Sequence, residues 1–296
     1  MARDWENTFR SWASPPGKTE QEKCENAERA IKKAKTTSEV LNQRNVTVFQ
    51  QGSYRNRTNV RTESDVDICM LCADSIFFDL PDGMTYTDFG IVTPADYSYS
   101  NYKMDVENAL VSYFGRDAVT RGNKAFDVHE NTYRIDADVV ACFEYRWYQH
   151  TGTYRTGVAF LTDQGQQIVN WPNQNYQNGV AKNEATSRGF KALVRILKNL
   201  RNEMKNNGIS AANSVPGYLI ECLTWNVPNE GFSHDTYTSD VRWTLAHLFN
   251  NTPNDADCKE WCEINDIKYL FHISQPWTRI QANSFLGAAW DYIGFT

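Results

Sequence analysis

Two short segments of this 296-residue chain carry the residue types that bind phosphate and metal ions. The first, Gln51-Gly52-Ser53-Tyr54, follows an apolar run, and the second, Asp65-Val66-Asp67-Ile68, opens another. A glycine–serine turn after a strand presents backbone N–H groups and a hydroxyl, which suit phosphate oxygens. Asp65 and Asp67 stand two residues apart on a predicted strand, so both carboxylates project from one face. Two hard oxygen ligands at this spacing favour Mg²⁺ bound beside a polyphosphate.

The elements that must position these segments fall into two halves. The first half alternates strand and helix patterns, with strands predicted over 46–50, 66–72 and 133–143, helices over 19–43 and 102–114, and a hairpin joining 158–161 to 167–169. Thr19 and Glu22 predict a capping box at the start of the first helix. The second half is helical, with one helix over 184–207 and others over 216–227, 241–249 and from 284 onward. We therefore expect an α+β catalytic core over 1–170 and a helical domain over 171–296.

The overall composition excludes several classes of protein. With 30 Lys and Arg against 36 Asp and Glu, the net charge of −6 argues against a surface built to coat nucleic acid. No run of 18 apolar residues occurs, so no membrane span is predicted, and the first residues lack an apolar leader. Seven cysteines at irregular spacings argue against a disulfide framework. These features predict a cytoplasmic protein.

The glycine–serine turn and the Asp-x-Asp pair, about a dozen residues apart, together resemble the polymerase-β-type nucleotidyltransferase core. With Thr58 added, the pattern is similar to the bacterial cyclic-oligonucleotide synthases related to cyclic GMP-AMP synthase and oligoadenylate synthetase. This resemblance implies a mixed sheet with flanking helices, followed by a helical C-terminal half. It also implies a third carboxylate from a later strand. Asp136 and Asp138 share a face there, and the family pattern of an Asp before two aliphatic residues favours Asp138, with Asp136 as the alternative.

The helical half extends the resemblance. Leu193-Val194-Arg195-Ile196-Leu197-Lys198 is similar to the family helix whose lysine grips the donor triphosphate, which implies that role for Lys198. Val215-Pro216-Gly217-Tyr218 resembles a segment that usually reads Pro-Ser-Tyr. Gly217 replaces the serine, so that phosphate contact is missing or comes from a backbone N–H.

Basic residues recur every three or four positions along the predicted helix over 184–207, which places them on one face: Arg188, Lys191, Arg195, Lys198, Arg201 and Lys205. A solvated face is the usual explanation for such a run. The mutual repulsion of these charges would also be relieved by a triphosphate, RNA or another anionic regulator. We assign phosphate binding to Lys198 alone and the remaining basic residues to the surface.

The resemblance implies a metal-dependent enzyme. Asp65, Asp67 and Asp138 would hold two Mg²⁺ ions, with Mn²⁺ as a possible substitute, while Gln51, Gly52, Ser53 and Lys198 bind a nucleoside triphosphate. The implied product is a cyclic di- or trinucleotide messenger in anti-phage signalling, which acts through a separate effector protein. Regulatory partner proteins are compatible with this role, and a nucleic-acid activator is not expected.

Two other functions fit the same residues. The same core could transfer a nucleotide to an RNA 3′ end, a small-molecule hydroxyl or a protein. A catalytically silent nucleotide-binding scaffold is the third hypothesis, and the intact carboxylate pattern counts against it.

Overall fold

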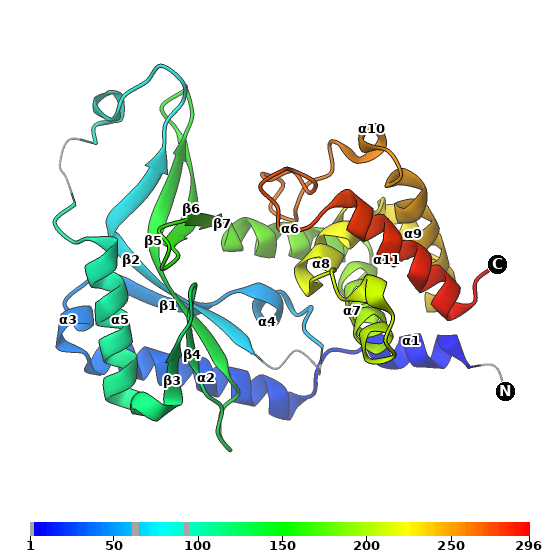
Figure 1. The fold of residues 1–296 in the computed structure, drawn as a ribbon, viewed down its shortest axis with the longest axis horizontal. Helices are drawn as coiled ribbons and strands as arrows, with labels where there is room; N and C mark the ends of the chain where they lie inside the picture. The colour runs from blue at the N-terminus through cyan, green and yellow to red at the C-terminus, as the bar shows by residue number, and fades with distance from the viewer. Residues whose placement is uncertain (1–2, 61–64, 92–94) are drawn as a thin grey trace. The chain divides into compact units, whose positions relative to one another are not determined.

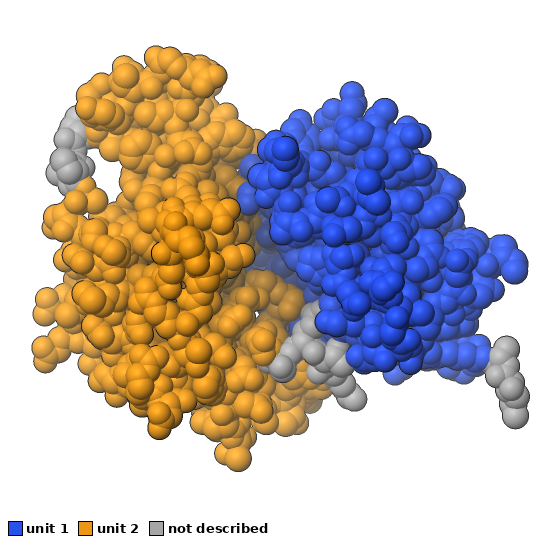
Figure 2. All heavy atoms as spheres, in the orientation of Figure 1, with its two compact units in different colours: residues 1–16, 55–63, 173–296 blue, residues 17–54, 64–172 orange. Residues whose placement is uncertain are grey.

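The computed structural model describes residues 3–60, 65–91 and 95–296, and it divides into two compact units (Figures 1 and 2). The sheet unit comprises residues 17–54 and 64–172. The helical unit comprises residues 1–16, 55–63 and 173–296. From the sequence we expect residues 1–16 and 55–63 to lie in the catalytic core, whereas the described residues 3–16 and 55–60 belong to the helical unit.

The sheet unit is built on a mixed sheet, which confirms the predicted fold class. In order across the sheet, its strands are β1 (Val46–Gln50), β2 (Val66–Asp79), β5 (Ala137–Tyr148), β4 (Phe126–Val128) and β3 (Val119–Arg121), while β6 (Tyr154–Leu161) pairs with β5 and with β7 (Gln167–Asn170). β2 and β5 are parallel, and every other described pairing is antiparallel. The predicted hairpin is β6–β7. β2 begins as a nearly continuous apolar run because both of its faces are buried there.

Helices α2 (Lys18–Thr37) and α5 (Tyr99–Phe114) pack on each other and on this sheet, with the short α3 (Glu39–Asn42) and α4 (Gly52–Asn56) beside them (Figure 1). The buried hydroxyl of Tyr102 donates to the carbonyl of Met70, 2.7 Å away, and so fixes α5 to β2. The predicted capping box at Thr19 is wrong. α2 begins one residue earlier, at Lys18, and its N-cap is Gly17, which follows two prolines and has no side chain to cap with.

The helical unit has a separate apolar core centred on α7. Its helices are α1 (Trp5–Ala13), α6 (Pro172–Ala185), α7 (Gly189–Asn206), α8 (Gly217–Trp225), α9 (Tyr237–Asn251), α10 (Asp255–Cys258) and α11 (Arg279–Ile293). The apolar side chains of α7, among them Phe190, Leu193 and Leu197, are buried. Within the three described ranges, no helix has both the length and the apolar character needed to cross a bilayer.

The single helix predicted over 184–207 is wrong, because α6 and α7 are separate helices. The chain turns at Ser187 and Arg188, whose φ angles of 49° and 74° are left-handed although neither residue is glycine. The hydroxyl of Thr186 accepts the N–H of Phe190 at 3.0 Å, and the Asn183 side chain accepts the N–H of Lys191 at 3.1 Å. These two side chains therefore satisfy N–H groups in the first turn of α7 and stabilise the break.

Candidate active site

The glycine–serine turn lies against the Asp-x-Asp segment. The N–H of Gln51 donates to the carbonyl of Asp67 at 2.9 Å. Gly52 has a φ of +65°, and a Cβ placed on it would lie 2.1 Å from the nearer carboxylate oxygen of Asp67. Glycine is thus required at position 52 both by its backbone conformation and by the space that the Asp67 carboxylate occupies.

Three aspartates form one row across three neighbouring strands. Asp67 on β2 is directly opposite Asp138 on β5, and Asp138 is directly opposite Asp127 on β4. Residues opposite one another in a sheet project from the same face, so the three carboxylates share a face. Asp65 stands just before β2, two residues from Asp67.

Asp127 is a member of this group that the sequence did not reveal. β4 contains only Phe126–Val128, and a three-residue strand gives too short a pattern to predict its pairing. An acidic residue between two apolar ones was the available signal. It becomes informative only once the register against β5 is known.

The structure separates Asp136 from Asp138. Asp136 precedes β5, and its carboxylate accepts the backbone N–H of Glu130 at 2.5 Å, so this side chain holds a loop. Asp138 lies within β5 in the row with Asp67. Burial raises the pKa of Asp138, and the charges of Asp65, Asp127 and Asp136 raise it further.

This concentration of negative charge has the chemistry of a divalent-cation site. Burial also raises the pKa of Asp127; the charge of His129 opposes this shift, while those of Asp136 and Asp65 add to it. Carboxylate oxygens are the ligands that Mg²⁺ and Mn²⁺ prefer, and a cation would relieve the repulsion among them. Within the described ranges, no group of three or more His, Cys, Asp or Glu side chains is arranged so that it could hold a metal ion as it stands.

Helix α4, which carries Ser53, is tied to α2 through Tyr54. The Tyr54 hydroxyl donates to a carboxylate oxygen of Glu20 at 3.2 Å, and the thiol of Cys24 lies beside it. Burial raises the pKa of Cys24 to about 12, so this thiol is neutral at physiological pH. Tyr54 therefore acts as an anchor that positions the glycine–serine turn relative to α2.

Lys198 occupies a buried position in α7. Its ammonium lies 2.8 Å from a carboxylate oxygen of Glu221 on α8, and the two side chains are 2% and 3% exposed. Gly217, at the start of α8, has no side chain to contribute. The charge of Lys198 is therefore compensated by Glu221 within the helical unit.

The expected surface position of Arg195 is wrong. Its Nε donates to the carbonyl of Ala13 and one terminal nitrogen to the carbonyl of Arg57, both at 2.7 Å. Arg195 thus joins α1 and the segment after α4 to α7 within the helical unit. Arg188, expected on the same helix face, is instead the left-handed residue that precedes α7.

Comparison with known proteins places the chain in a family. Residues 177–294 match the family model of the cGAS/DncV-like nucleotidyltransferase C-terminal helical domain. The chain is 42% identical to a cyclic dipyrimidine nucleotide synthase CdnE from Cecembia lonarensis, over all of both chains. It is 44% identical to a cyclic dipyrimidine nucleotide synthase CdnE from Legionella pneumophila, over 99% of each.

Two solved structures share the fold over nearly the whole chain. The CdnE cyclic dinucleotide synthase of Elizabethkingia meningoseptica, solved with GTP and Apcpp, aligns with a TM-score of 0.82 at 34% identity, covering 98% of this chain and 99% of that one. The CdnE c-UMP-AMP synthase of Rhodothermus marinus, solved with Apcpp and Upnpp, aligns with a TM-score of 0.86 at 29% identity, covering 98% and 97%.

Proposed function

The chain belongs to the cGAS/DncV-like nucleotidyltransferases and joins nucleoside triphosphates into a cyclic oligonucleotide, and we propose that its product is a cyclic dinucleotide of two pyrimidine nucleotides. The observation that carries the chemistry is the row of Asp67 and Asp138 beside the Gly52 turn. The pyrimidine preference is inferred from the two CdnE relatives that are 42% and 44% identical over nearly their full lengths.

Asp65, Asp67 and Asp138 are the residues that we assign to the metal site. The family generally depends on a divalent cation, and we propose a pair of Mg²⁺ ions, with Mn²⁺ able to replace them. When bound, such ions neutralise charge on phosphate oxygens and lower the pKa of a coordinated hydroxyl. The all-carboxylate donor set and the raised pKa of Asp138 support this assignment.

The glycine–serine turn is assigned to the phosphates of the donor nucleotide. Gly52 lets the backbone approach the ligand closely, and the Ser53 hydroxyl can donate to a phosphate oxygen. Gln51 holds the turn against β2 through its bond to the Asp67 carbonyl. Lys198, which is paired with Glu221, remains a predicted phosphate ligand.

The reaction needs positioning rather than a covalent enzyme intermediate. A ribose hydroxyl oxygen of one nucleotide bonds to the α-phosphorus of the other, the bond from that phosphorus to the bridging oxygen breaks, and pyrophosphate leaves with the hydroxyl proton released. A second transfer of the same kind closes the ring. Holding both reactants in line can lower the barrier by about 7–11 kcal/mol. We further propose that the product acts through a separate effector protein in anti-phage defence.

Product analysis tests this function. The wild-type protein is incubated with labelled UTP, CTP, ATP and GTP, singly and in pairs, with Mg²⁺, and products that resist phosphatase are identified by mass spectrometry. We expect a cyclic product containing only pyrimidines, absent from the Asp65→Asn/Asp67→Asn variant. A purine in the main product would refute the base assignment. Absence of any cyclic product with either Mg²⁺ or Mn²⁺ would refute the proposed activity.

A further inference from the structure

The row of aspartates on the mixed sheet continues by one strand beyond Asp127. Thr120 on β3 is directly opposite Asp127 on β4, which is itself opposite Asp138 on β5. Residues opposite one another project from the same face, so a hydroxyl extends the line of carboxylates. This end of the row therefore presents polar groups that are not among the metal ligands assigned above, which are Asp65, Asp67 and Asp138.

An imidazole lies beside these two side chains. His129 follows β4 and stands two residues from Asp127, so alternation puts both side chains on the same face. Its Nε2 lies 2.9 Å from the hydroxyl oxygen of Thr120 and 3.7 Å from a carboxylate oxygen of Asp127. The side chains of His129 and Asp127 are 44% and 48% exposed, so both are open to a ligand on this face of the sheet.

The position of this end relative to the glycine–serine turn decides which part of the substrates meets it. The turn lies against Asp67, at the β2 end of the row, and is assigned to the donor phosphates. In an in-line displacement, the attacking oxygen and the departing pyrophosphate lie on opposite sides of the α-phosphorus. Pyrophosphate held at the turn therefore places the attacking ribose on the side of Asp138 and Asp127.

A ribose brings two neighbouring hydroxyls to this place, one of which attacks while the other does not react. An ionised carboxylate only accepts hydrogen bonds, so Asp127 can take one from a ribose hydroxyl. Opposite residues of an antiparallel pair have Cβ atoms about 4.5–5.5 Å apart, which lets the hydroxyls of one ribose face Asp138 and Asp127 together. The two opposed carboxylates thus match one reacting hydroxyl and one held hydroxyl.

We propose that Asp127 accepts a hydrogen bond from the ribose hydroxyl that does not attack and thereby fixes which hydroxyl reacts. The inference rests on the proposed function, since it concerns the acceptor sugar of the same reaction. Asp127 then determines the linkage of the product, while its negative charge still adds to the field around the metal carboxylates. Thr120 and His129 form the polar wall beside that sugar.

Sugar analogues and the linkage of the product test the proposal. The kcat/KM for pyrophosphate release is measured with UTP, 2′-deoxy-UTP and 3′-deoxy-UTP, and the linkage formed from UTP is determined with a nuclease specific for 3′–5′ bonds. The proteins are the wild type, Asp127→Ala and Asp127→Asn. Asp117→Ala is the matched control, because Asp117 is exposed in the turn Arg116–Ala118 before β3 and lies outside the row. Thermal unfolding confirms that each variant is folded.

The analogue that still reacts carries the attacking hydroxyl and lacks the one that Asp127 holds. We expect its kcat/KM to be about tenfold below that of UTP in the wild type, which corresponds to about 1.4 kcal/mol, and equal to that of UTP in Asp127→Ala. Asp127→Ala should also form a mixture of 2′–5′ and 3′–5′ linkages from UTP. Asp127→Asn, whose amide oxygen still accepts a hydrogen bond, and Asp117→Ala should keep a single linkage.

A single, unchanged linkage in Asp127→Ala would overturn the proposal, as would an analogue-to-UTP ratio that is the same in Asp127→Ala and wild type; if neither analogue reacts, the linkage decides. A folded Asp127→Ala that forms no product would overturn it too, because an orienting hydrogen bond does not account for a complete loss. Failure of the proposed function is distinct, because it appears as the absence of a cyclic product from the wild-type protein. A purine product changes only the nucleotide used in the assay, since the sugar and not the base is varied.

Discussion

Replacing Gly52 by alanine should separate the cost of backbone strain from the cost of displacing the Asp67 carboxylate, which we assign to the metal site. At a φ of +65°, an alanine costs about 1–2 kcal/mol relative to glycine in the folded state. Alanine also lowers the conformational entropy of the unfolded chain, which favours folding by about 0.4–1 kcal/mol and offsets part of that cost. The net loss of about 1 kcal/mol should lower the Tm by about 2–4 °C.

The effect on activity should be far larger. The new Cβ would lie 2.1 Å from an oxygen of Asp67, and non-bonded Cβ contacts essentially never fall below 3.0 Å. The carboxylate must therefore move by about 1 Å, a displacement that can cost about 100-fold in rate. We expect Gly52→Ala to lower the rate of pyrophosphate release by about that factor at saturating nucleotide.

Gly165 provides the matched control within the same unit. It has a φ of +81° in the turn between β6 and β7, and a Cβ placed on it would meet no atom within 4 Å. Gly165→Ala should therefore lose a similar stability in thermal unfolding and keep the wild-type rate. Wild-type activity in Gly52→Ala, or an equal loss of activity in Gly165→Ala, would refute the reasoning.

Three further substitutions test other parts of the sheet unit. Tyr54→Phe removes the hydroxyl that holds α4 to α2. Denaturant titration should show a loss of about 1 kcal/mol in the free energy of unfolding, and steady-state kinetics should show a raised KM for nucleotide. An unchanged KM would contradict the anchoring role of Tyr54. Asp163→Asn should cost about 2 kcal/mol of unfolding free energy, less than the roughly 3–5 expected for a fully buried pair, because Asp163 is 34% exposed while its partner Lys103 is buried. Hydrogen bonds from Arg121 and Lys103 lower the pKa of Asp163 to about 2. The contribution of Asp163 to the free energy of unfolding is therefore complete above the unfolded pKa of about 3.9 and is lost as the pH falls through 2. A difference in unfolding free energy between Asp163→Asn and wild type that did not change with pH would contradict this. Asp127→Asn removes one of the crowded negative charges, so the Tm of the metal-free variant should lie above that of the metal-free wild type. The rise in Tm on adding metal should be smaller in the variant than in the wild type. An equal rise in both proteins would exclude Asp127 from the metal site.

The glycine–serine turn and the carboxylates on β2 could be predicted because their geometry is local. Side-chain alternation along one strand decides which residues share a face, and Asp65 and Asp67 need no other element to establish it. The third carboxylate is different. Alternation treats Asp136 and Asp138 alike, and they separate only because a loop donates to Asp136 while β5 begins at Ala137.

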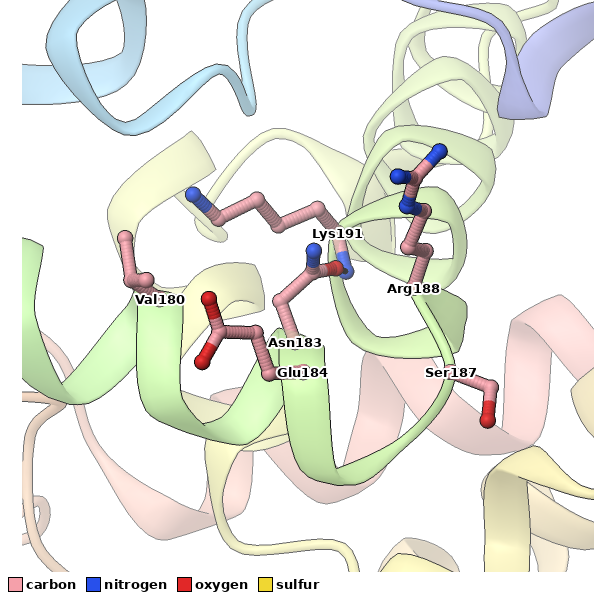
Figure 3. A pocket seen from close by; sticks show the side chains of 6 residues that line it. All are labelled: Val180, Asn183, Glu184, Ser187, Arg188 and Lys191. Carbon is pink, nitrogen blue, oxygen red and sulfur yellow. Dashed lines mark hydrogen bonds between the residues drawn. The ribbon is translucent and has the colours of Figure 1, made fainter.

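The errors in the helical half have a common physical origin. A basic residue every three or four positions looks the same whether a helix face meets water or a second helix. Lys198 is buried because Glu221 on α8 compensates its charge, and Arg195 because carbonyls from two distant segments do so. The break at Ser187 and Arg188 (Figure 3) carries neither glycine nor proline at its left-handed positions, and the adjacent Gly189 alone does not distinguish a break from the interior of a helix.

The most direct test of the central claim compares Asp138→Asn with Asp136→Asn in synthesis of the cyclic product. These residues are two positions apart and receive the same substitution, but only Asp138 lies in the row with Asp67. We predict that Asp138→Asn loses at least about 100-fold in rate, as expected for a group that acts in the transition state, and still binds a nucleotide analogue. Asp136→Asn should keep its activity and lose about 1 kcal/mol of stability with its loop contact. An active Asp138→Asn beside an inactive Asp136→Asn would contradict the assignment of the catalytic carboxylates.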